Sequence, residues 1–131
     1  MTCGRRFPIR KPHFEPSGRR TANFPHTVWQ RLSHMNFWMA YELKRIGHEK
    51  PVYPARAYES WPTADRDSSE QEWQEAIVQF RVHLAHLAKL AESPAHVLAQ
   101  EVDATHPDHT KQSSSLVAAL WHTIVHNSYH I

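Results

Sequence analysis

The sequence predicts an all-α protein, folded as an up-down four-helix-bundle-like domain, and we expect this bundle to be incomplete. Only three of the 131 residues are glycine, and the alternating valine, isoleucine and threonine runs that are typical of strands are missing. Three long segments instead carry apolar residues three and four positions apart, which is the spacing of one helix face. Hydrophobic residues make up 40% of the chain and include five tryptophans, enough for the core of one domain. We place this domain at residues 24–131, after an arm at residues 1–23.

The arm is basic, irregular and rich in proline. Its first twenty residues contain six arginine or lysine side chains and one glutamate, a net charge of +5. Since the whole chain carries +2, the remainder carries −3. Basic arms can contact nucleic acid, but this one has only Phe7 and Phe14 as aromatic residues before residue 21 and no nucleic-acid-binding motif. We therefore expect a solvated leader, and nucleic acid is not the expected partner.

The first helix is expected at about residues 27–46. Pro25 and Thr27 suit a helix start, because proline fits the first turn and threonine can cap the free amides. The apolar residues that follow share one face of this helix; they are Leu32, Met35, Met39, Leu43 and Ile46. Gly47 is expected to supply the left-handed residue that commonly ends a helix.

A long loop with three prolines is predicted at residues 48–68. Loops of this length are uncommon in compact domains unless they have a role. Because the loop contains Tyr53, Tyr58 and Trp61, we expect it to pack onto the helices.

A second helix is predicted after Ser69. Ser69 and Glu72 match a capping box, in which each side chain accepts a hydrogen bond from the other residue's backbone amide. Apolar residues then recur at intervals of four and three until the helix stops before Pro94; they are Trp73, Ile77, Phe80, Leu84, Leu87 and Ala91. A short helical piece at residues 95–102 and a polar loop at residues 103–111 follow.

The last predicted helix begins at one of the serines at positions 113–115. Its apolar residues cover more than half of the helix circumference; they are Leu116, Val117, Leu120, Trp121, Ile124, Val125 and Tyr129. A helix of this kind is expected to lie centrally in the bundle.

Histidine is unusually frequent, with twelve histidines against thirteen acidic residues. His122, His126 and His130 lie four residues apart on the last helix, so neighbours share a face with Cβ atoms ~5–6 Å apart. One metal ion can therefore bridge either adjacent pair, but not His122 and His130, which are ~12 Å apart along the axis. A third ligand has to come from another helix, as in other metal sites inside bundles.

His34 is the best third ligand, because it lies at the edge of the apolar stripe of the first helix. His83 and His86 on the second helix compete for that place, but each precedes a core leucine and is expected to point outward. Two histidines four residues apart are a weak signal in a chain with twelve of them. From spacing alone, surface and core roles for these histidines are favoured over metal binding.

The residues around these histidines are more specific than their spacing. Residues 121–131 (WHTIVHNSYHI) resemble the last-helix signature of the DinB-like superfamily, in which a histidine–asparagine–x–tyrosine–histidine pattern provides two metal ligands. Residues 24–38 resemble the earlier helix of that family, whose histidine is the remaining ligand. Residues 58–81 resemble its connecting loop and next helix.

This resemblance covers about residues 24–131 and implies a helical bundle with one divalent metal ion held by His34, His126 and His130. His122 would lie beside the triad. The resemblance also implies a metal-dependent enzyme, of hydrolase type or transferring low-molecular-weight thiols, whose substrate is a small molecule such as a thiol adduct. Zinc or nickel is the expected metal and iron an alternative, because all three accept nitrogen ligands.

The sequence departs from the family pattern at both ends. Family members have a helix before the one that carries the first ligand, and a Gly-Gln pair after the last histidine. We therefore expect a truncated or frame-disrupted version of a longer family member, which sequencing the coding DNA on both sides would test.

No general base stands out in the sequence. Four residues near the expected ligands are candidates, with packing or hydrogen bonding as the favoured role: Tyr41, Glu42, Asn127 and Tyr129. Trp38, Trp61 and Trp121 are candidate walls of a pocket, although large aromatic residues are more often part of the core.

Cys3 is the only cysteine, which excludes an internal disulfide and a thiolate metal cluster and suits a reducing cytosol. No apolar run approaches the ~18 residues of a membrane span, and the N-terminus lacks a secretory signal. We therefore expect a cytoplasmic protein with no membrane partner. A homodimer is expected because an incomplete bundle leaves apolar faces exposed. The alternative to an enzyme is a non-catalytic metal-binding scaffold.

Overall fold

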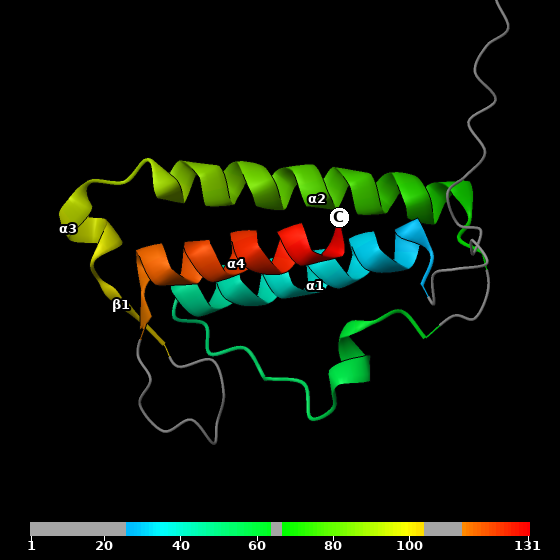
Figure 1. The fold of residues 1–131 in the computed structure, drawn as a ribbon, viewed down its shortest axis with the longest axis horizontal. Coiled ribbons are helices and arrows are strands. Elements are labelled where there is room, and N and C mark those ends of the chain that lie inside the picture. The colour runs from blue at the N-terminus through cyan, green and yellow to red at the C-terminus, as the bar shows by residue number, and fades with distance from the viewer. Residues whose placement is uncertain (1–25, 64–66, 104–113) are drawn as a thin grey trace, which may run out of the picture.

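The computed structural model describes residues 26–63, 67–103 and 114–131. Over these residues the chain is mostly helical, which confirms the predicted all-α class. In order, the elements are α1 (Val28–Ile46), the 3-10 helix η1 (Ala57–Ser60), α2 (Glu70–Ala91), α3 (Ala95–Leu98), β1 (Glu101–Val102), β2 (Ser114–Ser115) and α4 (Leu116–His130) (Figure 1). The predicted arm at residues 1–23 and most of the predicted loop at residues 103–111 lie outside the described residues.

The predicted helix starts are confirmed by their capping bonds. The Thr27 hydroxyl accepts a hydrogen bond from the Gln30 amide (3.1 Å), and the Gln30 side chain accepts one from the Thr27 amide (2.8 Å). Ser69 and Glu72 form the same reciprocal pair at α2, at 3.2 and 2.7 Å. Ser115 caps α4 through the Ala118 amide at 3.3 Å. These bonds satisfy amides that have no partner inside the helix, so the local sequence determines where each helix begins.

The end of α1 differs from the prediction. Gly47 has a φ of −77° and is not left-handed, while His48 and Lys50 adopt positive φ values of 58° and 50°. The Gly47 amide donates to the Leu43 carbonyl at 3.0 Å, so Gly47 continues the helical hydrogen bonding by one residue. The reversal of the chain therefore falls on His48 instead of Gly47.

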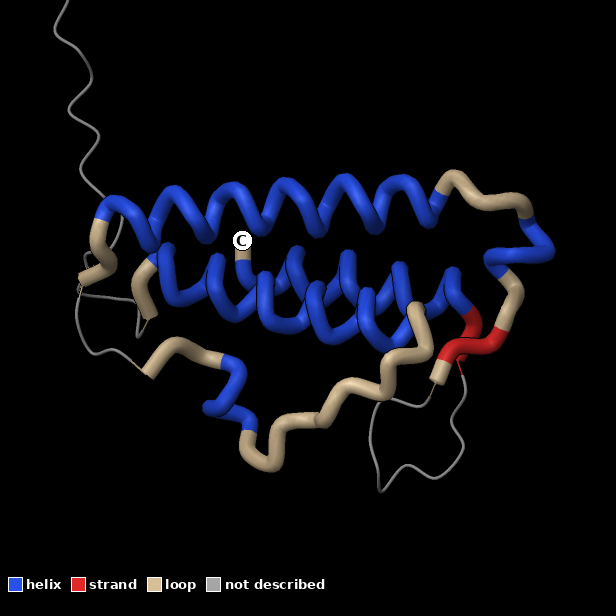
Figure 2. The backbone as a smooth tube through the Cα atoms, turned by 180° about the vertical axis from the view of Figure 1, so that it is seen from behind, coloured by secondary structure: helices blue, strands red, loops and turns tan. Residues whose placement is uncertain are grey.

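The three long helices are not arranged in simple alternation. α1 and α2 run in the same direction, and α4 runs the opposite way (Figures 1 and 2). The connection from α1 to α2, which carries η1, therefore crosses the length of the bundle. The up-and-down alternation that the sequence predicted is wrong for this pair, because a long crossover joins them where a tight turn would make them antiparallel.

α1 is the helix that packs most extensively on both of the others, whereas α2 and α4 contact each other little. The main core lies among α1, the second half of α2, β1 and the first half of α4; its buried members are Met35, Met39, Leu87, Val102, Leu116, Ala119 and Leu120. Trp29, Trp73 and Ala76 form a second cluster where α1 and α2 begin. The prediction that α4 is central is wrong, because much of its apolar surface is exposed.

The predicted apolar stripe of α2 is confirmed in part. Trp73 and Leu87 are buried, and Ile77 and Phe80 pack against the two cores. Leu84 and Ala91, by contrast, are exposed. The face of α2 that α1 covers is therefore rotated relative to the predicted stripe.

The connection between α2 and α4 includes two antiparallel strands of two residues each, which a buried arginine links to α1. β1 and β2 are antiparallel, with Glu101 opposite Ser115, so the predicted helical piece at residues 95–102 ends at Leu98. The Arg45 side chain, 1% exposed, forms an ion pair with Glu42 at 2.7 Å and donates to the Ser114 hydroxyl and the Asp103 carbonyl. Arg45 therefore ties α1 to both sides of this connection.

The loop after α1 packs onto the bundle in part, as predicted. The Tyr53 ring contacts those of Trp38 and Tyr41, with centroids 5.5 and 5.8 Å apart, and Trp61 contacts α1 as described below. Tyr58 is exposed and does not pack as expected. Among the described residues, no helix combines the length and hydropathy that crossing a bilayer requires.

Candidate metal centre

His34, His126 and His130 converge between α1 and α4. Each can present one ring nitrogen such that the three nitrogens lie within 4.8 Å of one another. The ring centroids of His34 lie 5.2 Å from those of His126 and 4.7 Å from those of His130, and the latter two rings are 4.7 Å apart. The structure thus brings together the three residues that the sequence singled out.

The helices explain this convergence. His126 and His130 are one turn apart on α4, and both are half-buried on the flank that faces α1. His34 is 6% exposed and lies within the contact between α1 and α4. The antiparallel packing of α1 and α4 therefore positions the three histidines, and the loop after α1 covers them from a third side.

Trp61 and Trp38 form walls around the triad. The Trp61 ring stacks between two imidazoles, those of His34 (3.9 Å, 12°) and His26 (3.9 Å, 18°). It also meets the His130 ring edge-on at 5.7 Å. Trp38 lies 6.4 Å from the His34 ring and 6.2 Å from the His126 ring. Two indoles thus limit the access of water to the triad.

Hydrogen bonds orient two of the three imidazoles. The His34 Nδ1 lies 3.2 Å from the Ser60 carbonyl oxygen, which can only accept, so this nitrogen carries the proton. The Ser60 hydroxyl in turn donates to the Ala57 carbonyl at 2.7 Å, which holds this carbonyl's segment in place. The His126 Nδ1 lies 3.4 Å from the Asn127 Oδ1. Both arrangements leave Nε2 as the nitrogen that is free to bind a metal.

Burial disfavours the protonated form of two of the three histidines, His34 and His130. The pKa of His34 is lowered from 6.5 to about 4, mainly by burial; the Ser60 carbonyl opposes this shift, and the neighbouring His130, His126 and His26 contribute smaller decreases. Burial also lowers the pKa of His130, with added effects from His126, Arg31 and His26. Since only a neutral imidazole can bind a metal, these shifts favour the ligating form at neutral pH.

The other histidines that the sequence considered lie away from the triad. His122 is exposed on α4 and is not part of the group. His86 is exposed on α2, as predicted. His83 is half-buried, with its Nδ1 3.4 Å from the Asn36 Oδ1, so the prediction that it points outward is wrong. The reason is the rotation of α2, which turns His83 toward α1.

The sequence offered four candidates for a general base, and the structure shows what each of them contacts. Glu42 is paired with the buried Arg45. Tyr41 is buried, and burial together with the charge of Glu42 raises its pKa. Tyr129 is 88% exposed, and Asn127 contacts His126.

Of the three candidate wall residues, Trp38 and Trp61 flank the triad as predicted. Trp121 does not, because it is exposed on another side of α4. The Ser60 carbonyl, His26 and Arg31 were not anticipated. For Arg31 a signal existed in the sequence, since a residue three positions before His34 shares its helix face.

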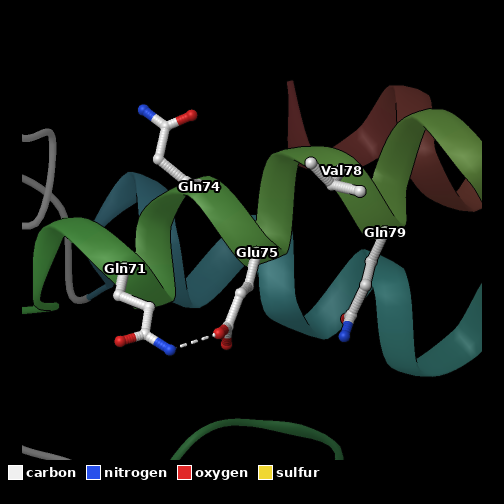
Figure 3. A pocket seen from close by; sticks show the side chains of 5 residues that line it. All are labelled: Gln71, Gln74, Glu75, Val78 and Gln79. Atoms are coloured by element: carbon white, nitrogen blue, oxygen red, sulfur yellow. Dashed lines mark hydrogen bonds between the residues drawn. The ribbon is translucent and has the colours of Figure 1, made fainter.

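A shallow hollow elsewhere on the surface has no comparable chemistry. It lies along the outer side of α2 and is lined by Gln71, Gln74, Glu75, Val78 and Gln79 (Figure 3). The Gln71 amide donates to the Glu75 carboxylate at 2.8 Å. All five residues come from a single helix, so the hollow lacks the convergent groups that a binding site needs.

Comparisons of this chain with models of protein families, with curated proteins and with solved structures find no match. The relationship to the DinB-like superfamily therefore stays a prediction from the sequence motifs.

Proposed function

We propose that this protein binds one divalent metal ion through His34, His126 and His130 and is a metal-dependent enzyme of the DinB-like kind. The observation that carries the proposal is the convergence of three histidine nitrogens from two helices within 4.8 Å. The same three residues are the ones that align with the family's ligand motif. We also propose that the protein belongs to the family's four-helix-bundle architecture and acts in the cytoplasm.

The donor set fits a borderline divalent ion. Three imidazole nitrogens suit zinc, nickel or iron, and zinc binds histidine at about 2.0–2.1 Å. Nitrogens bound tetrahedrally at that distance are about 3.3 Å apart. A separation of up to 4.8 Å can close to this value by small side-chain rotations, because two of the three ligands are only half-buried.

The proposed reaction is a hydrolysis or the transfer of a small thiol. A divalent ion in this site would supply a Lewis acid that activates water or a thiol. Trp38 and Trp61 would exclude bulk water from the reacting groups. The positive charge of Arg31, which acts on His130, favours a substrate with an anionic group such as a thiolate or carboxylate.

A non-catalytic metal-binding scaffold is the second candidate. The environments of two candidate general bases favour it: Glu42 forms an ion pair with Arg45, and the pKa of Tyr41 is raised. A metal site without a nearby base can still bind an ion and stabilise a fold.

The metal site is tested by elemental analysis of the purified protein, followed by titration of the metal-free protein with zinc and nickel. We expect about one ion per chain, lost in each of the variants His34→Ala, His126→Ala and His130→Ala. His122→Ala is the matched control, since it removes an exposed histidine one turn from His126. Equal binding by the control and the triad variants would refute the site.

The two candidate functions differ in turnover. An enzyme, loaded with metal, is expected to hydrolyse an activated ester or to transfer a small thiol to an electrophile, with the rate lost in His126→Ala. A scaffold binds the same ion with the same stoichiometry but turns over neither substrate.

A further inference from the structure

Large apolar side chains that are exposed gather on two helices. Within the described residues, nine of the twelve lie on α2, on α4 or at the residue after α4: Val78, Val82, Leu84, Val117, Trp121, Ile124, Val125, Tyr129 and Ile131. Trp121 is the largest of those on α4 and is 62% exposed. Exposed tryptophan and isoleucine on adjoining turns are uncommon on the free surface of a monomer.

Four of the exposed residues of α4 form a stripe along one side of the helix, and the exposed His122, Val125 and Tyr129 lie beside it. Val117, Trp121, Ile124 and Ser128 follow one another at intervals of four, three and four, so they share one face. At about 100° of rotation per residue, His126 and His130 fall on a different side of the helix. We call Val117, Trp121, Ile124 and Ser128 the α4 stripe. The stripe is thus separate from the metal site.

The lack of charged residues on α4 indicates which kind of partner could cover the α4 stripe. Residues 116–131 contain no lysine, arginine, aspartate or glutamate. A charged partner would therefore find no opposite charge on this helix, and its own charges would lose water without compensation. A second α4 is uncharged in the same way. By contrast, the outer side of α2 mixes Val78 with amides and Glu75 (Figure 3).

The spacing of residues in the α4 stripe is the same in both directions along the helix, so the stripe can pair with a second copy of itself. Read backwards, intervals of four, three and four are unchanged, so in two antiparallel copies of α4 each stripe residue falls opposite a stripe residue of the other copy. In that pairing Trp121 lies against Ile124 of the second copy, and Val117 lies against Ser128 of the second copy. Such a twofold contact is isologous and closes on itself, which is the commonest symmetry of homo-oligomers.

We propose that the α4 stripe is the interface of a homodimer, in which α4 of one chain packs antiparallel to α4 of a second copy. This proposal does not depend on the metal site or on the enzymatic activity. Sedimentation velocity of the full chain over a range of concentrations is expected to show a monomer–dimer equilibrium. The variants Trp121→Asp and Ile124→Asp are expected to be monomeric at concentrations where the parent chain is dimeric.

The matched control is Val82→Asp, which places a carboxylate on the outer side of α2 at a residue that is 60% exposed. It is expected to leave the dimer unchanged. Because all three positions are exposed, the helix content by circular dichroism should be the same in every variant. A parent chain that is monomeric throughout would overturn the proposal, as would equal effects of the α4 and α2 substitutions.

A cross-linking experiment tests the antiparallel arrangement. In a Cys3→Ser background, chains with Val117→Cys and chains with Ser128→Cys are oxidised separately and as a mixture. The two positions are eleven residues apart, or about 16 Å along the helix, and a disulfide needs Cα atoms closer than about 7 Å. Disulfide-linked dimers are therefore expected in the mixture alone. Cross-linking of each variant with itself would indicate a parallel pair and overturn the proposed arrangement.

Discussion

The Trp61 ring lies flat against the imidazole of His34, with centroids 3.9 Å apart and planes within 12° of parallel. Trp61 belongs to the crossover between α1 and α2, whereas His34 belongs to α1. The neighbouring Ser60 carbonyl binds the Nδ1 of the same imidazole. The loop therefore fixes both the position and the rotation of a proposed metal ligand, and this relationship leads to the first prediction.

Trp61→Ala is expected to weaken metal binding without removing a ligand. Losing the stacked ring frees His34 to rotate, and groups that orient a ligand typically contribute a factor of about 10 to 100 in metal affinity. Competition with a zinc indicator measures the change. Trp61→Phe should restore most of the affinity, and Tyr58→Ala, an exposed aromatic residue in the same loop, serves as the control. Unchanged affinity in Trp61→Ala would mean that the stack does not position His34.

The stability of the metal-free protein is expected to fall in mild acid. An unfolded histidine titrates near 6.5, and His34 in the folded chain titrates at about 4 because of its burial. Between these values the unfolded chain binds more protons, so the free energy of unfolding decreases as the pH drops from 6.5 to about 4. At about 1.4 kcal/mol per pKa unit, His34 alone accounts for at most about 3.5 kcal/mol. His130 acts in the same direction.

Urea denaturation at several pH values measures this effect. His34→Gln should flatten the dependence on pH, whereas His122→Gln, at an exposed position, should leave it unchanged. If both variants keep the slope of the parent chain, the acid sensitivity has another origin.

Zinc is expected to raise the melting temperature through the three histidines. A ligand that binds only the folded state stabilises it by about 2.7 kcal/mol at a concentration one hundred times its dissociation constant. Differential scanning calorimetry with and without zinc measures the shift, which should disappear in His130→Ala. A shift of equal size in that variant would assign the stabilisation to zinc bound elsewhere.

Arg45→Ala is expected to destabilise the fold by about 3–5 kcal/mol, the range for breaking a buried ion pair from one side. The substitution leaves Glu42 without its cation and removes the donors to Ser114 and Asp103. Lys44→Ala, at the exposed neighbouring position, should change the stability little. Denaturant titration of both variants gives the comparison, and similar values would show that Arg45 contributes no more than a surface residue.

Local patterns predicted the helices well because capping and spacing act over a few residues. The Ser69–Glu72 box and the three-and-four spacing place α2 within one residue of its observed start. The pairing of His126 with His130 follows from one turn of helix, and the motif supplied His34. What the sequence did not indicate was the relative rotation of the helices, which depends on packing between distant segments. The exposure of Leu84 and Trp121 and the partial burial of His83 all follow from that rotation.

The direction of α2 and the roles of Ser60 and His26 could not be predicted from the sequence, because they also depend on contacts between distant segments. A backbone carbonyl carries no residue-specific signal, and the stack on Trp61 requires a loop path that no periodicity encodes. Gly47 was misjudged because glycine permits the left-handed conformation without requiring it, and His48 adopts that conformation instead.

The split of the triad between α1 and α4 has a consequence for folding. His34 and His126 are about ninety residues apart in the chain, so an ion held by both would close most of the domain into a loop, as a cross-link does. Closing a long loop before the helices dock is slow, since the entropy is lost before the contacts form. His126 and His130, by contrast, are adjacent on one helix and can hold an ion locally. We expect metal to reach the α4 pair first and to speed the docking of α4 on α1, so that refolding with zinc is faster than without it.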